Sequence, residues 1–491
     1  MALRPCIRRH TEVPLFIKHN TYTRLTTFLK ECFRWDSVFT KWVAAVALPI
    51  ILQELIGASL HIIDSLMVSG LGDAPYSAVT QANRFSFLFN LFCFGTVSGG
   101  AIFMSQYWGA HDIPRMRQSM GICLITVTLL SGLFTAAAML FPGVIISFFL
   151  PPDSASHSYA VTYLVTVAPS YVLVAISTVY SMCLKAGEKT YIPLIAGVTS
   201  IATNTVLNYG MIYGHFGLPA MGVYGAAVAT DIAAMVQLVV NLAFAYGKRL
   251  PAGATFRQMM GADRGFVRRF AKTVTPVIFN EGLWALGVTM YGVFYGHMGD
   301  TAVAATGLCS TIDSLVWVFI FGMMHATAII VGKTLGAGKK EEAYLYSKRM
   351  IAAAMLMGLL LGGVLIAIRP PILALYSGLS AEVLAKARVI LLFGGLTMWF
   401  RAFNCINVVG ILRSGGDTVF SLVLDVGSMW AIGVPLCALA TFVFHFPVEY
   451  VYLCSFAEEI VKMLIGIPHF IGRKWQRNLT EKKGDSVLEA H

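Results

Sequence analysis

Three titratable residues recur at helical spacing within one apolar run: Glu54, His61 and Asp64. Glu54 and His61 are seven residues apart and share one helix face, and Asp64, three residues after His61, is adjacent to it. Such a stripe could pass a proton, or its carboxylates could bind Na⁺, because oxygen ligands suit hard cations. The alternative is structural: Asp64 hydrogen-bonds a neighbour at an interface and His61 packs among apolar side chains.

A second acid, Glu281, lies five residues after Pro276 in another apolar run. A proline inside a helix frees backbone carbonyls, which can ligate a cation or admit a kink. Trp284, one turn further on, could line a cavity for an aromatic cation or could face lipid. We expect Trp284 and Asn280, together with His61, to line a substrate cavity.

Further polar side chains fall inside apolar runs, where each charge is a functional hypothesis because it is expensive there. Asn204 and Asn208 are one turn apart on one helix face, and their alternative role is helix–helix hydrogen bonding. Glu458 and Glu459 precede Lys462, which predicts an intrahelical ion pair near a helix end. The remaining candidates are Thr230, Asp231, Asp313, His325 and Asp425.

The composition indicates that membrane-spanning helices position these residues. The chain has 491 residues, of which 57% are hydrophobic and 12% charged, and its mean hydropathy is +0.71. Soluble domains carry about 25% charged residues, so the apolar excess here must face lipid. The net charge of +11 comes from Lys and Arg between the apolar runs, which is typical of a membrane protein rather than of a nucleic-acid-binding one.

Apolar segments bounded by charge, Gly or Pro recur twelve times, and we expect each to span the bilayer. Both flanking regions are basic, so we place both termini in the cytoplasm of a multi-pass plasma-membrane protein. The segments are 42–69, 77–108, 118–148, 158–183, 191–214, 221–246, 268–297, 302–333, 346–368, 387–411, 416–443 and 448–472.

An internal repeat organises these segments. A shift of 227 residues aligns 49–110 with 276–337 without a gap, and it superimposes Glu54 on Glu281 and Gly72-Asp73 on Gly299-Asp300. Leu184-Lys185-Ala186-Gly187 also matches Leu412-Arg413-Ser414-Gly415. Since the shift covers six spans, the fold class is all-α integral membrane, with 12 transmembrane helices in two parallel six-helix repeats around a central cleft.

We therefore expect five regions along the chain. They are an N-terminal tail (1–40), an N-lobe of spans one to six (41–247), a cytoplasmic linker (248–267), a C-lobe of spans seven to twelve (268–473) and a C-terminal tail (474–491).

Several chemistries have no motif in this sequence. It has no GxxxxGK[ST], HExxH, GxSxG or CxxC, and its nine cysteines are scattered. We expect no enzymatic activity, no cofactor and no structural metal, and energy supplied by an ion gradient.

Four stretches in order resemble the MATE family of multidrug and toxic compound extrusion transporters over residues 40–475. The first is Ile63-Asp64-Ser65 with Gly70-Leu71-Gly72, and the second is Gly95 through Gln106-Tyr107-Trp108-Gly109-Ala110. The third is Met221-Gly222-Val223-Tyr224-Gly225, and the fourth is Leu412-Arg413-Ser414-Gly415-Gly416-Asp417-Thr418.

The resemblance implies two six-helix lobes, alternating access, and export of amphiphilic, often cationic, compounds against Na⁺ or H⁺ entry. It maps the family's first-helix Asp to Asp64, and the ion-site residues of its DinF-like branch to Asn204, Asn208 and Thr230. Asp64, Asn204 and Thr230 are the expected Na⁺ ligands if Na⁺ is the ion. Asn208 departs from the Asp often found in that branch, while Glu281 resembles the seventh-span Glu of other members.

The sequence thus predicts a monomeric secondary active exporter, closer to the DinF-like than the NorM-like branch, with Asp64, Glu281 and Glu54 as ion-coupling acids. One alternative is a lipid-linked-precursor flippase, which needs a cationic cavity, with Arg84 and Arg401 as its candidate bases. The other is an intramembrane enzyme, for which no metal or nucleophile constellation is visible.

Overall fold

The described part of the chain is helical throughout in the computed structural model, which describes residues 31–32, 35–376 and 378–481. The side chains of residues 61 and 62 and most of the predicted N-terminal tail lie outside this description. Ten of the helices are long and apolar enough to cross a membrane. An all-helical membrane protein is therefore confirmed.

The helices up to the central connection are α2 (Ser37–Ser69), α3 (Asp73–Gly109), α4 (Ile113–Leu140), α5 (Pro142–Ser147), α6 (Ala155–Ala186), α7 (Tyr191–Tyr213), α8 (Val223–Gly247) and α9 (Phe256–Met259). Those after it are α10 (Arg264–His297), α11 (Asp300–Gly336), α12 (Lys340–Ala374), α13 (Ala381–Cys405), η1 (Ile406–Arg413), α14 (Thr418–Ser428), η2 (Met429–Gly433), α15 (Val434–Phe442), α16 (Val448–Ser455) and α17 (Ala457–Ile471), where η denotes a π-helix.

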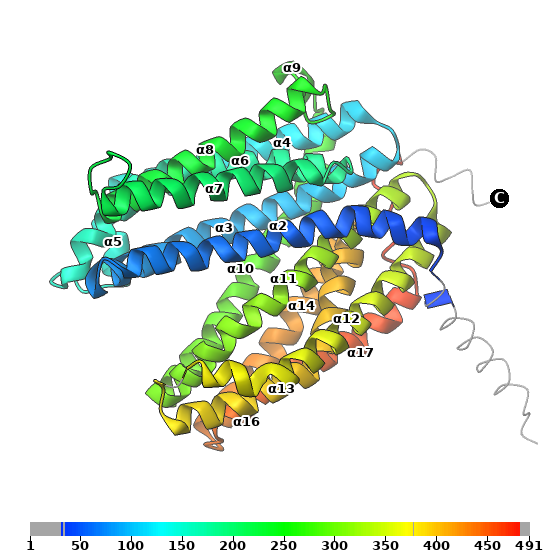
Figure 1. Ribbon diagram of the computed structural model, residues 1–491. Helices are drawn as coiled ribbons and strands as arrows, with labels where there is room; N and C mark the ends of the chain where they lie inside the picture. The colour runs from blue at the N-terminus through cyan, green and yellow to red at the C-terminus, as the bar shows by residue number, and fades with distance from the viewer. Residues whose placement is uncertain (1–30, 33–34, 377, 482–491) are drawn as a thin grey trace, which may run out of the picture.

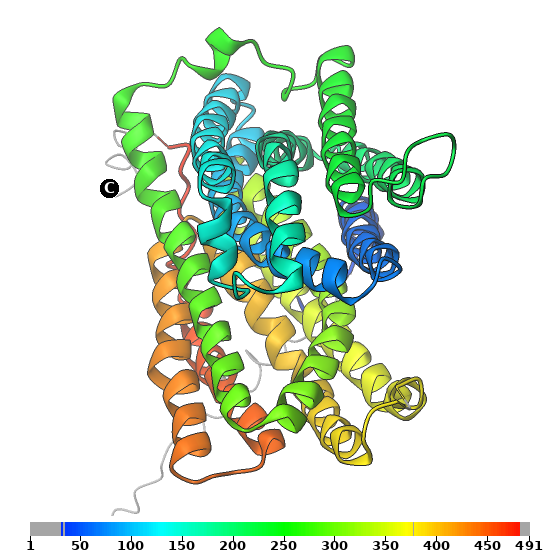
Figure 2. The ribbon, with the colours of Figure 1, turned by 90° about the vertical axis from the view of Figure 1, so that its left-hand side faces the viewer.

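Two of the predicted spans are not among the ten. One is α7, and the other is the α16–α17 pair, in which α17 has only 15 residues and carries both acids of the predicted ion pair. The predicted linker also ends early, because Asp263 caps α10 by accepting the Phe266 N–H at 2.8 Å, so the helix starts at Arg264. Figure 2 shows this connection, which contains α9, running from α8 to α10.

The repeat is visible in the turns that precede α3 and α11. Gly72 and Gly299 have φ of 105° and 97°, which favour glycine, and each is followed by an Asp in the first helical turn. A negative side chain there complements the positive end of the helix dipole. The glycine and aspartate that match in the sequence therefore start corresponding helices.

The helices form a first group (α2–α8) and a second group (α10–α17), whose axes converge at one end of the molecule and diverge toward the other (Figure 1). One apolar core lies within the first group and another within the second. A third core forms where the groups meet.

The first long helix of each group packs partly on the opposite group. Phe39, Val43 and Ile50 of α2 lie in a core with α11, α12 and η1 of the second group. Phe266 and Phe270 of α10 lie in the core of the first group, where they contact Phe103. These crossings join the two groups through apolar contacts as well as through the connection between α8 and α10.

At the converging end, hereafter the closed end, α3 and α11 approach backbone to backbone. A Cβ added at Gly109 would lie 1.9 Å from the Lys333 carbonyl oxygen, and one at Gly336 would lie 1.8 Å from that of Gln106. Only glycine permits this approach, as is common where membrane helices pack closely. The two glycines occupy equivalent places in the repeat.

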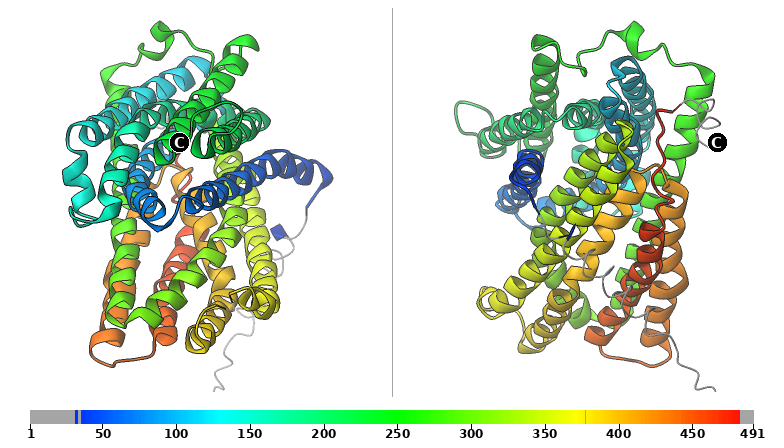
Figure 3. Two further views of the ribbon diagram at one scale, coloured as in Figure 1. Left: turned by 60° about the vertical axis from the view of Figure 1, so that its left-hand side comes forward. Right: turned by 90° about the vertical axis from the view of Figure 1, so that its right-hand side faces the viewer.

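The segment after α17 closes the same end, and Figure 3 shows it extending from the second helix group toward the first. Trp475 is fully buried against the core between the groups. The Leu479 N–H donates to Gln106 Oε1 at 2.7 Å, and Arg477 pairs with Asp417 at 2.7 Å. This segment therefore contacts both groups at once.

Candidate functional site

Asp64 of α2 lies beside the two asparagines of α7 that the sequence placed on one face. Asn208 Nδ2 donates to Asp64 Oδ1 at 2.7 Å and to Asn204 Oδ1 at 3.0 Å. Both asparagines are 1% exposed, and Asp64 is partly buried. The structure thus brings together three of the predicted ion-coupling residues through one amide.

This cluster keeps unused acceptor capacity. Asn208 Oδ1 is buried and has no hydrogen-bond partner, and Asp231 Oδ1 on the neighbouring helix α8 is in the same state. No Lys or Arg forms an ion pair with Asp64 among the described residues. A buried site with spare oxygen acceptors and no base is suited to a proton or a small cation.

Thr230 of α8 is not bonded to Asp64. Its hydroxyl donates to the Ala226 carbonyl at 3.0 Å, within its own helix. It also lies at hydrogen-bonding range of Tyr163, which Asp64 and Asp231 both influence electrostatically. Thr230 therefore lies beside the cluster.

The other residues of the predicted α2 stripe do not join this cluster in the described structure. Glu54 is partly buried and forms no ion pair within the described part of the chain. His61 is in α2, but its side chain lies outside the described residues. Its predicted place in a substrate cavity stays a prediction.

Glu281 is paired with a base. Its Oε1 lies 2.6 Å from Arg413 Nη1, and both side chains are buried. Gly95 of α3 packs against this acid, since a Cβ there would lie 3.1 Å from Glu281 Cγ. Glu281 is thus at the junction of the two helix groups, but its charge is already balanced within the second group.

Lys462 of α17 lies among three acids. Its Nζ is 2.9 Å from Asp425 Oδ1 on α14 and 3.4 Å from one oxygen each of Glu458 and Glu459. The intrahelical pairs expected from the sequence are present, but the shortest contact joins two helices. Asn280 Nδ2 donates to Asp425 Oδ2 at 2.9 Å, so Asn280 belongs to this network.

The two bases considered for a cationic cavity do not provide one. Arg401 forms a partly buried bidentate pair with Asp313, with contacts of 3.1 and 2.6 Å, and lies over the Trp317 ring. Arg84 is exposed and donates to Gln81 at 2.6 Å. Trp284 packs against the second group's core and stays a prediction as a cavity residue.

Arg413 and Lys185 are the buried residues that sequence reasoning missed as site residues. The signal was available, because the Leu-Lys-Ala-Gly and Leu-Arg-Ser-Gly tetrapeptides put a base at the same place in each repeat. Both bases are nearly inaccessible, at 6% for Lys185 and 2% for Arg413. Their positions next to helix ends made them look like ordinary interfacial charges.

The two helix groups therefore differ chemically. The first holds an acid that only amides contact, whereas the acids of the second share Arg413, Lys462 and Arg401. No group of three or more His, Cys, Asp or Glu side chains within the described ranges is arranged to hold a metal ion.

A comparison with known protein families divides the chain into the same two halves. A family model described as MatE matches residues 49–210 and again residues 276–439. The chain is 21% identical over 423 residues to the uncharacterized transporter YisQ of Bacillus subtilis, covering 86% of this chain and 90% of that protein. It is 26% identical over 410 residues to multidrug resistance protein MdtK of Edwardsiella ictaluri, covering 80% and 85%.

The fold also has a solved counterpart. The MATE transporter VcmN of Vibrio cholerae in its bent form superimposes with a TM-score of 0.80 at 16% identity, covering 93% of this chain and all of that one. At this identity the likeness concerns the arrangement of helices alone.

Proposed function

Since this chain belongs to the MatE family, we propose that it is a secondary active multidrug efflux transporter that exports amphiphilic, cationic compounds by antiport against Na⁺ or H⁺. Its relatives include multidrug resistance proteins over most of its length, which supports this function. The observation that carries the proposal is the Asp64–Asn208–Asn204 cluster, an acid at membrane depth without a base.

In this proposal Asp64 binds the coupling ion. A carboxylate held by one amide bond can accept a proton or share a cation with nearby amide oxygens, and the unpaired Asn208 Oδ1 offers one such oxygen. Neutralising Asp64 changes what α2 contacts on α7, and α2 also packs on the second group. Ion binding can therefore act on the arrangement of the two groups.

Glu281 has a structural role in the same proposal. A carboxylate 2.6 Å from a buried guanidinium would have to give up that partner before binding another cation. Removing one partner of a buried pair costs about 3–5 kcal/mol, which makes Glu281 the less suitable of the two acids. The use of Asp64 with α7 asparagines supports the DinF-like branch.

We further propose that the first and second groups are the N-lobe (41–247) and C-lobe (268–473) of an alternating-access transporter that works as a monomer with twelve spans in parallel repeats. The closed end is then cytoplasmic, because Lys333, Lys339 and Lys340 gather there. The described conformation would be closed to the cytoplasm.

The test is dye efflux from proteoliposomes containing the Asp64→Asn variant, driven separately by a pH gradient and by a Na⁺ gradient. We expect Asp64→Asn to lose gradient-driven efflux, because the amide cannot bind the coupling ion. Asp73→Asn is the control, since it removes an exposed acid in the first turn of α3 that is not among the ion-coupling candidates. Efflux by Asp64→Asn equal to that of the control would refute the assignment of Asp64.

A further inference from the structure

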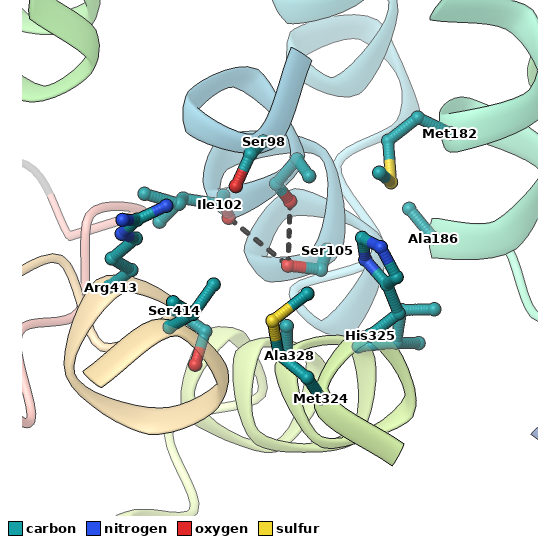
Figure 4. A pocket seen from close by; sticks show the side chains of 13 residues that line it. Ser98, Ile102, Ser105, Met182, Ala186, Met324, His325, Ala328, Arg413 and Ser414 are labelled. Carbon is teal, nitrogen blue, oxygen red and sulfur yellow. Dashed lines mark hydrogen bonds between the residues drawn. The ribbon is translucent and has the colours of Figure 1, made fainter. Parts of the chain in front are cut away.

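A small, partly open cavity lies between the two helix groups near the closed end. Its volume is about 30 Å³, and both groups line it. Ser98 and Ser105 of α3 and Ala186 of α6 face it from the first group, while His325 of α11 and Arg413 of η1 face it from the second (Figure 4). No Asp or Glu lines it.

Arg413 and His325 both bring donor capacity to this lining that no described acceptor uses. Arg413 is 2% exposed, and its Nε has no hydrogen-bond partner, although its Nη1 lies beside Glu281. His325 forms no hydrogen bond with the described residues and touches the Phe94 ring edge-on. Figure 4 shows the Arg413 and His325 side chains on opposite sides of the cavity.

Lys185 adds a further positive charge next to this cavity. It precedes Ala186, is 6% exposed and forms no hydrogen bond or ion pair with the described residues. Glu54 interacts with it only at longer range, and Lys185 itself acts electrostatically on His325. An ammonium buried without a partner costs several kcal/mol, so an anion bound nearby would stabilise the charged form of Lys185.

The repeat explains why two bases meet at this point. Lys185 and Arg413 occupy the same place in the two repeats, and each repeat supplies an equivalent acid, Glu54 or Glu281. In the second repeat the acid and base are 2.6 Å apart, whereas in the first they are not in contact. Arg413 therefore has an acid in contact with it, whereas Lys185 has none among the described residues.

We propose that this cavity binds a small inorganic anion such as chloride, held by Arg413 and His325 and attracted by Lys185. A volume of about 30 Å³ exceeds the roughly 10–15 Å³ that one water needs, so the cavity has room for a monatomic anion. Because the lining comes from both groups, the bound anion stabilises their contact at the closed end. This site is separate from Asp64 and does not depend on which ion drives transport.

The experiment is thermal unfolding of the purified full chain, titrated with sodium chloride against sodium gluconate at constant ionic strength. We expect a saturable chloride-specific rise in Tm of about 2 °C or more, because a ligand that binds only the folded state stabilises it. Lys185→Met and His325→Phe should remove this rise. The control is Lys333→Met, which removes a lysine paired with Glu188 at 2.7 Å and should keep it.

A second measurement covers the case in which Lys185→Met does not fold. Crystals of the unmodified chain soaked in sodium bromide should give an anomalous peak between Arg413 and His325. Equal Tm values in chloride and gluconate, or a chloride response that persists in both cavity variants, would overturn the proposal. A bromide-soaked cavity without an anomalous peak would also overturn it and would identify the occupant as ordered water only.

Discussion

Gly336 of α11 offers a sharp test of the closed end. In Gly336→Ala the new Cβ would lie 1.8 Å from the Gln106 carbonyl oxygen, which is main chain and cannot rotate away. Ordinary contact begins at 3.4 Å, so α3 and α11 must separate locally by about 1.6 Å. The three atoms nearest to that Cβ all belong to Gln106, so the substitution acts on the contact between the two helix groups.

The energetic effect follows from overpacking. Inserting a methyl group into a tightly packed contact costs about 1–3 kcal/mol when the neighbours must shift. A conformation in which α3 and α11 have separated avoids this overpacking. Its population should therefore rise by about 5- to 150-fold relative to the conformation in which they are in contact. Alanine is also the better helix former, so the helix itself is not weakened.

The assay is the distance distribution between spin labels on the closed ends of α4 and α12, measured in detergent without substrate. We expect Gly336→Ala to increase the long-distance population. Gly307→Ala is the control, because Gly307 is on the same helix and its added Cβ would have nothing within 4 Å. Identical distributions for the two variants would refute the view that this contact holds the groups together.

Three further predictions concern stability and are measured by thermal unfolding. Asp313→Asn should cost about 1.5–3 kcal/mol because it removes the negative charge opposite the partly buried Arg401, and an unchanged Tm would contradict a stabilising pair. Trp475→Ala should cost about 3–5 kcal/mol, since the ring is fully buried between the groups, and a loss typical of an exposed residue would contradict this. Outside the membrane, the Arg115 hydrogen bond and the α10 cap hold the pKa of Asp263 below its ordinary value. The contribution of Asp263 to folding stability should be complete above its ordinary pKa and should be lost as pH falls through the lowered pKa. Asp263→Ala should not show this loss.

The sequence predicted the helical class for a physical reason, whereas it joined Asp64 to the α7 asparagines only through the family resemblance. Apolar runs of membrane length report helices directly, and the one-turn spacing of Asn204 and Asn208 fixed them on one face. A polar face inside a membrane needs a polar partner, which Asp64 provides. Periodicity placed the two asparagines on one face, and the family resemblance joined them to Asp64.

The pairing of the acids in the second group could not be predicted in the same way. Glu281 and Arg413 are 132 residues apart in the sequence. Asp425 of α14 forms an ion pair with Lys462 of another helix, α17. Helical spacing describes neighbours on one helix only, so it suggested pairs within the Glu458–Lys462 stretch. Which helix faces meet is decided by packing between helices, and no spacing rule contains that information.

The internal repeat also pointed to two basic residues that were not recognised as site residues from the sequence. It placed Lys185 and Arg413 at one position, near the ends of apolar runs, yet neither was named as a candidate site residue. Both are buried because the two helix groups cover each other at the closed end. Burial between two domains is invisible to a hydropathy profile, which considers one segment at a time.

The segment after α17 also sets the order in which the molecule can be completed. The hydrogen bond between Gln106 and Leu479 joins residues that are 373 positions apart. At a synthesis rate of about 5–20 residues per second, the second partner emerges about 20–75 s after the first. The first helix group must therefore persist in the membrane throughout that interval, and α11 covers Gly109 before the segment after α17 can complete the closed end.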